Sequence, residues 1–425
     1  MGQKRILSAT AASTALILAL SACAGGDSSG GGERTLDVWI MEGTHPDASA
    51  FFDEVAADFE ERTGATVNVE FIPWADAHDK FVTAIAGDTM PDVAEVGTTW
   101  TPEFAQAGAL ADITDRVGDT SAYVPGLIEA GTVEDRLYGV PWHAAVRAVL
   151  YRTDVFEEHG LEEPRDWEQL REAALTIKDA EEDMIAFPVP GGAEYSLLPF
   201  VWGAGGDIAE QGDDGTWTSG IDSPQAREGI TFFTDLALKD GLSSTGAATW
   251  LETDVQDNFV DGKVAMAISG SWTPKAILEA NPDLEGRVAA FPIPGPEGGH
   301  SPSFLGGSHL SVFNGSEDQD LAWEYVQLLT SDEYARRWTE ETTYLPGKQE
   351  QLARYAESED PLIRPFAVQM SQAGRGVPVT PAYGKVQGQK VLQTMVQSIL
   401  SGDASVEEAS ATAAETIEKT LNGDG

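Results

Sequence analysis

The stretch LDVWIMEGTHPDASAFFDEVAADFEERTGATVNVEFIPWADAHDKFVTAIAGDTMPDVAEVG, residues 36–97, decides the fold of this 425-residue chain. Three runs rich in apolar residues predict strands at Leu36–Met41, Val67–Phe71 and Asp92–Val96. Between them, apolar residues recur at helical spacing at Phe52, Val55, Ala56 and Phe59, and again over residues 76–86. This strand–helix alternation predicts a parallel sheet covered by helices, an α/β fold.

Parallel sheets of this kind bind their ligands beyond the carboxyl ends of the strands. The segments that directly follow the three strands are Glu42–Thr44, Pro73–Asp76 and Gly97–Trp100. These segments are therefore the first candidates for a binding site.

The rest of the chain continues the mixed pattern and shows no internal repeat. Two short extended runs are predicted within residues 138–151, and a strand at Val264–Ile268. Gln211–Gly215 predicts a hairpin turn, because Gly and Asp favour tight turns. The Pro- and Gly-rich residues 291–307 predict a loop or a crossover. Helices are predicted over residues 167–178, 225–238, 321–329 and 406–421.

The chain is strongly acidic, with 26 Lys and Arg against 70 Asp and Glu and a net charge of −44. Nucleic-acid binding is excluded on these grounds, because phosphate would be repelled. Docking by charge to an anionic membrane is disfavoured for the same reason. Two readings of the acidity stay open: an ordinary solvated surface, or adaptation to high salt, which screens self-repulsion.

The N-terminus has the features of a secretion signal. Lys4 and Arg5 precede an apolar run, Ile6–Leu20, that is shorter than the roughly 20 residues of a membrane span. Leu20–Cys23 resembles the lipobox of bacterial lipoproteins, and Cys23 is the only cysteine in the sequence. We predict a signal peptide over residues 1–22, and a lipidated Cys23 with a flexible Gly- and Ser-rich tether over residues 23–33.

No catalytic or cofactor motif is present in the sequence. It lacks GxGxxG, GxxxxGK[ST], HExxH and GxSxG patterns, and no two of the six His have metal-ligand spacing. We therefore predict no catalytic residue, no metal site and no cofactor. With 70 acidic residues, however, almost any carboxylate spacing occurs, so a glycoside hydrolase stays open as an alternative.

Tryptophan gives the first sign of a ligand. Six of the eleven Trp stand at predicted element ends or in loops beside small or polar residues: Trp74, Trp100, Trp142, Trp202, Trp250 and Trp272. Indole rings in such places indicate a cleft lined by flat apolar faces with polar groups between them. A pyranose ring, which has an apolar C–H face and a rim of hydroxyls, fits a cleft of that kind.

Several motifs together resemble the solute-binding lipoproteins of carbohydrate ABC importers, the group that includes maltose-binding protein. The likeness spans nearly the whole chain beyond residue 33. The motifs, in order, are Phe59–Gly64, Met90–Val93, Leu137–Trp142, Leu150–Asp154, Asp261–Met266, Gly270–Trp272 and Leu305–Ser308.

The resemblance implies an α/β fold of two lobes, a hinge that the chain crosses several times, and a ligand cleft between the lobes. The N-terminal lobe would comprise residues 34–145 plus 289–345, and the C-terminal lobe residues 146–288 plus 346–425. The hinge would lie near His143–Arg147, Val288–Pro292 and Tyr344.

The resemblance also implies site residues. Trp100, Tyr195 and Trp272 match aromatic sugar-stacking positions of the maltose-binding branch. Local context adds further candidate ligand contacts: Glu42, Trp74, Asp76, Trp142, Arg147, Trp202, Trp250, Gly307 and Ser308.

The implied function is capture of an oligosaccharide by lobe closure, a population shift toward the state that binds better, followed by delivery to a membrane permease. The protein would be a monomer on the extracellular face of the cell membrane, held only by the lipid on Cys23. Val38–Gly43 resembles actinobacterial members that take up N-acetylglucosamine oligomers such as chitobiose. Maltodextrins or cello-oligosaccharides are the next candidates, and a non-sugar solute is a further alternative.

Overall fold

The predicted alternation at the start of the chain is present in the computed structural model, which describes residues 34–423. The signal peptide, Cys23 and the tether lie outside the described residues and stay predictions. The first elements are β1 (Thr35–Glu42), α1 (Ser49–Thr63), β2 (Thr66–Pro73), α2 (Trp74–Gly87) and β3 (Val93–Gly97). Gly64 ends α1 with a left-handed φ of 70°, a conformation that glycine adopts without strain.

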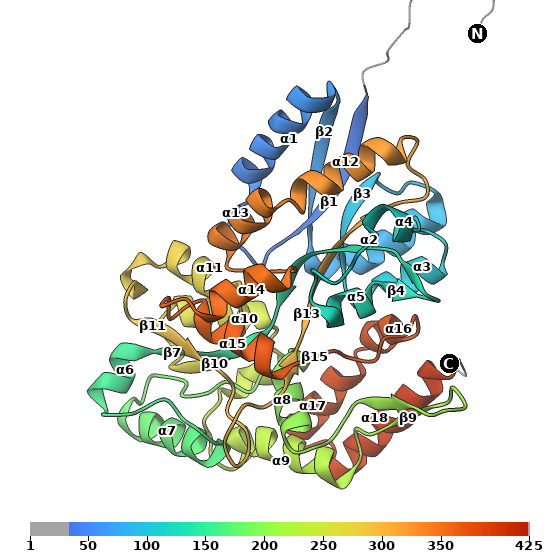
Figure 1. Cartoon of the computed structure of the whole chain (residues 1–425). Helices are drawn as coiled ribbons and strands as arrows, with labels where there is room; N and C mark the ends of the chain where they lie inside the picture. The colour runs from blue at the N-terminus through green and yellow to red at the C-terminus, as the bar shows by residue number, and fades with distance from the viewer. Residues whose placement is uncertain (1–33, 424–425) are drawn as a thin grey trace, which may run out of the picture.

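These strands form one side of a six-stranded sheet with the order β14-β6-β13-β3-β1-β2. β1 pairs in parallel with both β2 and β3, as the sequence predicts. The other strands are antiparallel additions from later in the chain: β6 (Val140–Ala145), β13 (Gly306–Val312) and β14 (Leu345–Pro346). This sheet occupies the upper half of Figure 1.

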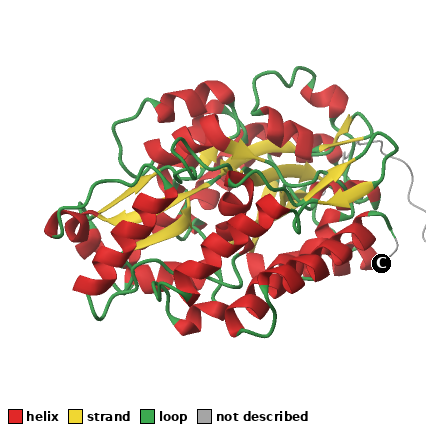
Figure 2. Cartoon of the chain, turned by 90° about the horizontal axis from the view of Figure 1, so that it is seen from below, coloured by secondary structure: helices red, strands yellow, loops and turns green. Residues whose placement is uncertain are grey.

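A second, three-stranded sheet lies in the lower half of Figure 1. Its central strand is β7 (Arg147–Arg152), which pairs antiparallel with β10 (Met266–Gly270) and β11 (Val288–Phe291). Helices cover both sheets, so that the strands run through the interior when the molecule is seen from below (Figure 2). The two halves reproduce the predicted two-lobe α/β architecture.

The chain passes between the sheets more than once. Only Val146 separates β6 in the large sheet from β7 in the small one. The chain returns after β11 through residues 292–305, which lie within the stretch 291–307 predicted as a loop or a crossover. It leaves the large sheet again after β14. Because β11 pairs within the small sheet, we propose that the second lobe boundary lies in residues 292–305 rather than at 288/289. The boundaries at 145/146 and 345/346 stay predictions.

The remaining helices are mostly short. Those in the upper half are α3 (Thr101–Gln106), α4 (Thr114–Val117), α5 (Pro125–Ala130), α12 (Gln319–Leu329) and α13 (Asp332–Thr342). The others are α6 (Thr153–Glu158), α7 (Trp167–Ala180), α8 (Glu194–Gly203), α9 (Pro224–Leu238), η1 (Thr245–Thr249), α10 (Glu252–Val260), α11 (Thr273–Ala280), η2 (Pro282–Leu284), α14 (Gln349–Ala356), α15 (Arg364–Ala373), α16 (Tyr383–Gly388), α17 (Val391–Ser401) and α18 (Val406–Leu421).

Three two-stranded ladders complete the fold. They are β4 (Thr132–Val133) with β5 (Arg136–Leu137), β8 (Ala209–Gln211) with β9 (Trp217–Ser219), and β12 (Ser303–Phe304) with β15 (Gly374–Arg375). The β8–β9 hairpin confirms the turn predicted at Gln211–Gly215. None of the helices among residues 34–423 is long and apolar enough to cross a membrane.

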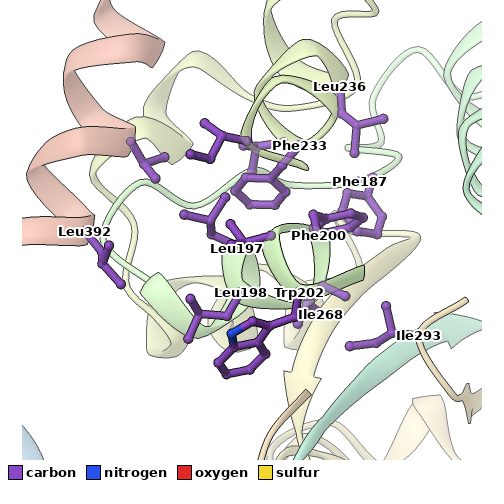
Figure 3. Close-up of a cluster of buried hydrophobic side chains, with 14 of the residues drawn as sticks. Phe187, Leu197, Leu198, Phe200, Trp202, Phe233, Leu236, Ile268, Ile293 and Leu392 are labelled. Atoms are coloured by element: carbon purple, nitrogen blue, oxygen red, sulfur yellow. The ribbon is translucent and has the colours of Figure 1, made fainter. Parts of the chain in front are cut away.

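Each half has its own hydrophobic core. In the lower half, α8 is central: Leu197, Leu198 and Phe200 are fully buried in one cluster, and the Phe200 ring stacks on Phe233 of α9 (Figure 3). Trp202, near the end of α8, belongs to the same core and is 3 % exposed. Its position beside Gly203 in sequence predicted a cleft residue, but the helix turns the indole into the core.

Candidate functional site

A cavity of about 310 Å³ is lined by elements of both halves. The large-sheet half contributes the loop after β1, the segment after β3 and the start of β13, while the small-sheet half contributes β7 and the first residues of α8 and α10. This volume lies at the lower end of the range of about 300–1,000 Å³ typical of small-molecule sites. The lining residues are Thr44, Trp74, Gly97, Thr98, Thr99, Trp100, His143, Ala145, Arg147, Gly192, Ala193, Glu194, Tyr195, Leu251, Glu252, Trp272, Phe304, Gly307, Ser308, Tyr344, Gln387 and Gln393.

Arg147, the first residue of β7, is the cationic centre of this cavity. Its Nε and Nη2 donate to the two carboxylate oxygens of Glu252 at 3.1 and 3.0 Å, a bidentate pair. The guanidinium also lies over three rings, with distances to the ring centroids of 4.4 Å for Tyr195, 4.8 Å for Trp272 and 5.4 Å for Phe304. Arg147 therefore holds three aromatic side chains in place while its charge is neutralised by Glu252.

A buried polar cluster lies beside Arg147. The ring of Tyr195 stacks on Phe304 with centroids 4.1 Å apart and an interplanar angle of 7°. Gln387 of α16 donates both amide hydrogens, to Glu194 Oε1 at 3.0 Å and to the Tyr195 hydroxyl at 2.6 Å. Glu194 is 7 % exposed, and burial raises the pKa of its carboxyl. Acceptors at this end of the cavity suit a ligand that carries hydroxyl or N–H donors.

Two tryptophans line the part of the cavity that belongs to the large-sheet half. Trp74 begins α2 and Trp100 precedes α3, and their ring centroids are 5.4 Å apart at a tilt of 53°. Both rings are only half-buried, so their free faces are available to a ligand. Each follows the carboxyl end of a parallel strand, β2 or β3, which is where the sequence predicts binding residues.

The floor of the cavity is a hydrogen-bonded network. Glu95 of β3 is buried and accepts from Ser308 Oγ at 2.6 Å, from the Met41 backbone N–H at 2.9 Å and from His143 Nε2 at 3.0 Å. Tyr344 packs on the His143 ring with centroids 4.1 Å apart, and its hydroxyl lies 2.9 Å from Thr44 Oγ1. Three donors fix the carboxylate of Glu95, so the strands beneath the cavity are held in a rigid arrangement.

His309, next to Ser308 on β13, gives the fold a testable pH dependence. The carbonyl of Leu127 can only accept, so Nε2 of His309 carries the proton and Nδ1 accepts from Thr101 Oγ1, both at 2.8 Å. Burial lowers the pKa of His309 from 6.5 to about 4. The unfolded chain therefore binds a proton at a higher pH than the folded chain, and stability falls as the pH drops from 6.5 toward 4.

We expect His309 to account for a loss of about 2 kcal/mol in the free energy of unfolding between pH 7 and pH 5, by linkage. Urea unfolding of the protein and of His309→Gln at both pH values measures it. The variant is less stable at pH 7, but its stability should fall less on acidification. Equal losses in the two proteins would show that another group carries the effect.

The structure brings seven of the predicted site residues together around the cavity: Trp74, Trp100, Arg147, Tyr195, Trp272, Gly307 and Ser308. Trp272, which precedes α11, packs with its ring 5.4 Å from that of Tyr344. Gly307 has a φ of 141°, and a Cβ there would lie 2.2 Å from the backbone oxygen of His143. Only glycine fits at this point, where β13 pairs with Ala144 of β6.

Five predicted residues lie away from the cavity. Trp142 is 2 % exposed within β6 and stacks on Trp338 in the core, since its position on the strand points it to the opposite face of the sheet. Trp202 lies in the other core. Trp250 follows η1 and is half-buried against a cluster of core residues. Asp76 is exposed on α2, and Glu42 ends β1 outside the lining. For Trp142 and Trp202, core packing replaces the predicted ligand contact.

Several polar lining residues were not predicted as ligand contacts. Tyr344 was expected only at the hinge, and Glu194, Glu252, Gln387 and Gln393 were not expected at all. Glu252 could not be singled out among 70 acidic residues, and the two glutamines come from C-terminal helices with no motif of their own. Glu194 had a weak signal, because it directly precedes Tyr195. Across residues 34–423, no group of three or more His, Asp or Glu could hold a metal ion.

Residues 42–336 match the family model for bacterial extracellular solute-binding proteins. The chain belongs to this family. Among curated relatives, the diacetylchitobiose-binding protein DasA of Streptomyces coelicolor is 28% identical over 96% of both chains. The match covers most of the two-sheet body described above.

Solved structures of similar proteins agree with this solute-binding fold. An ABC transporter solute-binding protein of Thermotoga lettingae, bound with α-D-tagatose, has a TM-score of 0.82 and 30% identity, covering 91% of this chain and all of the other. The sugar-binding protein MalE of Xanthomonas citri has a TM-score of 0.76 and 25% identity over 92% and 98% of the two chains. The family binds solutes rather than transforming them, so the chain is a binding protein and not the glycoside hydrolase held open above.

Proposed function

We propose that this solute-binding protein takes an oligosaccharide into the cavity around Arg147 and delivers it to the permease of an ABC importer. The observation that carries the proposal is the composition of the lining: the rings of Trp74, Trp100, Tyr195 and Trp272 share the cavity with polar side chains such as Glu194 and Gln387. Aromatic faces complement the C–H faces of a pyranose, and carboxylate and amide oxygens accept from its hydroxyls.

Within this class we propose a chitobiose-type sugar of N-acetylglucosamine as the first candidate ligand. Its support is the likeness to a diacetylchitobiose-binding protein along 96% of the chain. Maltodextrins and cello-oligosaccharides come next. A site whose buried acceptors pair with particular hydroxyls discriminates strongly between sugars, so the lining also supports a narrow preference.

We further propose that the protein is a monomer at the extracellular face of the membrane, anchored through lipid on Cys23. The lipobox-like Leu20–Cys23 and the Gly- and Ser-rich residues that follow support this. Two or more acyl chains suffice for stable anchoring, and a tether keeps the body free to reach a permease.

A thermal-shift panel tests the function. We expect N,N′-diacetylchitobiose to raise the melting temperature by several degrees, because a ligand at 100 times its Kd adds about 2.7 kcal/mol. Maltotriose, cellobiose and trehalose form the sugar comparison, and spermidine and a tripeptide represent other solutes. A shift with spermidine or the tripeptide and with no sugar would contradict the sugar assignment. A shift with maltotriose alone would leave the class intact and correct the sugar.

A further inference from the structure

Helix α16, drawn in red where the two halves of Figure 1 meet, touches both of them. Tyr383 and Val386 anchor it in the core of the small-sheet half, since both are fully buried there. Gly384, also buried, faces the other half: a Cβ at this position would lie 2.2 Å from Glu103 Oε2 of α3 and 3.8 Å from Glu103 Cβ. No side chain larger than hydrogen fits between the two helices as they stand.

Glu103 is held firmly by its own half of the molecule. His78 Nε2 of α2 lies 3.0 Å from Glu103 Oε2. The neighbouring Phe104 is buried in the core between α2 and the large sheet, and the His78 ring stacks on it. Because the oxygen that faces Gly384 is the one that contacts His78, moving it away from α16 disturbs that contact.

One turn further along α16, Gln387 reaches the cavity. Its amide positions both Glu194 and Tyr195, as described above, and the orientation of that amide is fixed because only its nitrogen can face a carboxylate. A single six-residue helix thus contacts the opposite half at Gly384 and hydrogen-bonds two cavity residues through Gln387.

We infer that α16 is a clasp: its close approach to Glu103 accompanies lobe closure, and Gln387 transmits that closure to the ligand-contacting groups. The inference rests on the proposed function, because closure matters only if a solute is captured between the halves. It assigns Gly384, Glu103 and Gln387 as positioning residues for binding, none of which the sequence analysis selected.

The first test is a substitution with a designed rescue. Gly384→Ala should weaken N,N′-diacetylchitobiose binding about tenfold in calorimetry, the effect of one lost charge-assisted hydrogen bond between His78 and Glu103. Gly388→Ala is the matched control, because a Cβ there meets nothing within 4 Å. Adding Glu103→Ala to Gly384→Ala should restore affinity, because the carboxylate that collides with the new Cβ is then gone. The two Cβ atoms would lie 3.8 Å apart, an ordinary van der Waals contact. The melting temperature of ligand-free Gly384→Ala should match that of ligand-free Gly388→Ala.

The second test is a disulfide cross-link, and its first readout, the rate of oxidation, needs no sugar. In the full chain with Cys23→Ser, Glu103→Cys and Gly384→Cys would place two Cβ atoms 3.8 Å apart, about the mean separation in disulfides. We expect this pair to oxidise readily and the pair Glu103→Cys with Gly388→Cys to oxidise far more slowly. Protein oxidised after loading with diacetylchitobiose should retain the sugar through gel filtration, and reduction should release it.

The outcomes separate the two proposals. If the parent protein binds no sugar of the panel, the proposed function fails, whatever the cross-linking shows. If it binds but Gly384→Ala binds equally well, or the Glu103–Gly384 pair oxidises no faster than its control, the clasp is overturned. Loss of affinity that Glu103→Ala does not rescue would also overturn it, because the collision would then not be the cause.

Discussion

Replacing Arg147 with alanine is expected to weaken sugar binding at least 100-fold and to destabilise the fold by about 3 kcal/mol, near the lower end of the cost of breaking a buried ion pair. The Arg147 side chain is 7 % exposed and that of Glu252 25 %, so water would relieve only part of the stranded negative charge. The three rings around the guanidinium would also lose the group between them. Calorimetric titration and urea unfolding measure the two effects.

Arg152→Ala is the matched control for this prediction. Arg152 also makes a bidentate pair, to Asp154 at 2.7 and 2.6 Å, but it lies at the far end of the same strand and outside the cavity. We expect Arg152→Ala to leave sugar affinity unchanged. Equal losses of affinity in both variants would mean that β7, rather than the guanidinium of Arg147, is what binding requires.

Replacing Trp202 with alanine is expected to lower the free energy of unfolding by about 3–5 kcal/mol, the usual cost of removing a large buried side chain. The indole packs in the core of Figure 3, its Nε1 donates to Asp207 at 3.2 Å, and the Arg375 guanidinium lies 5.3 Å from the ring centroid. Urea unfolding at constant pH measures the loss.

Measuring sugar affinity distinguishes this structural role of Trp202 from the ligand contact that the sequence predicted. The folded fraction of Trp202→Ala should bind sugar as the parent protein does, and Trp202→Phe should recover much of the stability by refilling the core. If instead affinity falls while stability holds, Trp202 contacts the ligand and its assignment to the core is wrong.

Much of the architecture could be predicted from the sequence, because its signals are local. The parallel order of β1, β2 and β3 follows from apolar periodicity, and α18 has the predicted bounds Val406–Leu421, set at its start by a capping box between Ser405 and Glu408. The strand predicted at Val264–Ile268 lies instead at Met266–Gly270, because hydrogen-bonded pairing with β7 sets the two ends of the strand. How the chain alternates between two sheets is a tertiary property, and only the family resemblance anticipated it.

The candidate site was only partly predictable. Trp74, Trp100 and Trp272 were accessible to reasoning because each follows a strand and stands at the start of a helix. The place of Trp142 could not be predicted, because the face of the sheet on which it lies depends on the pleat of β6. The neighbouring Pro141 made this segment look like a loop rather than a strand. Gln387 gave no local signal at all: its role arises from hydrogen bonds to residues about 190 positions away.

The strand order of the large sheet also governs how the molecule can fold. β13 lies between β3 and β6, and β14 pairs with the other edge of β6. Gly97 can therefore pair with Ser308, and His143 with Pro346, only after these later strands are present. Pairings so distant along the chain make folding slow, because loop-closure entropy must be overcome before the contacts that reward it form. A chain emerging from a ribosome cannot close this sheet until most of it has been synthesised. The delay leaves time in which the polypeptide is still extended enough to be threaded through a secretion channel.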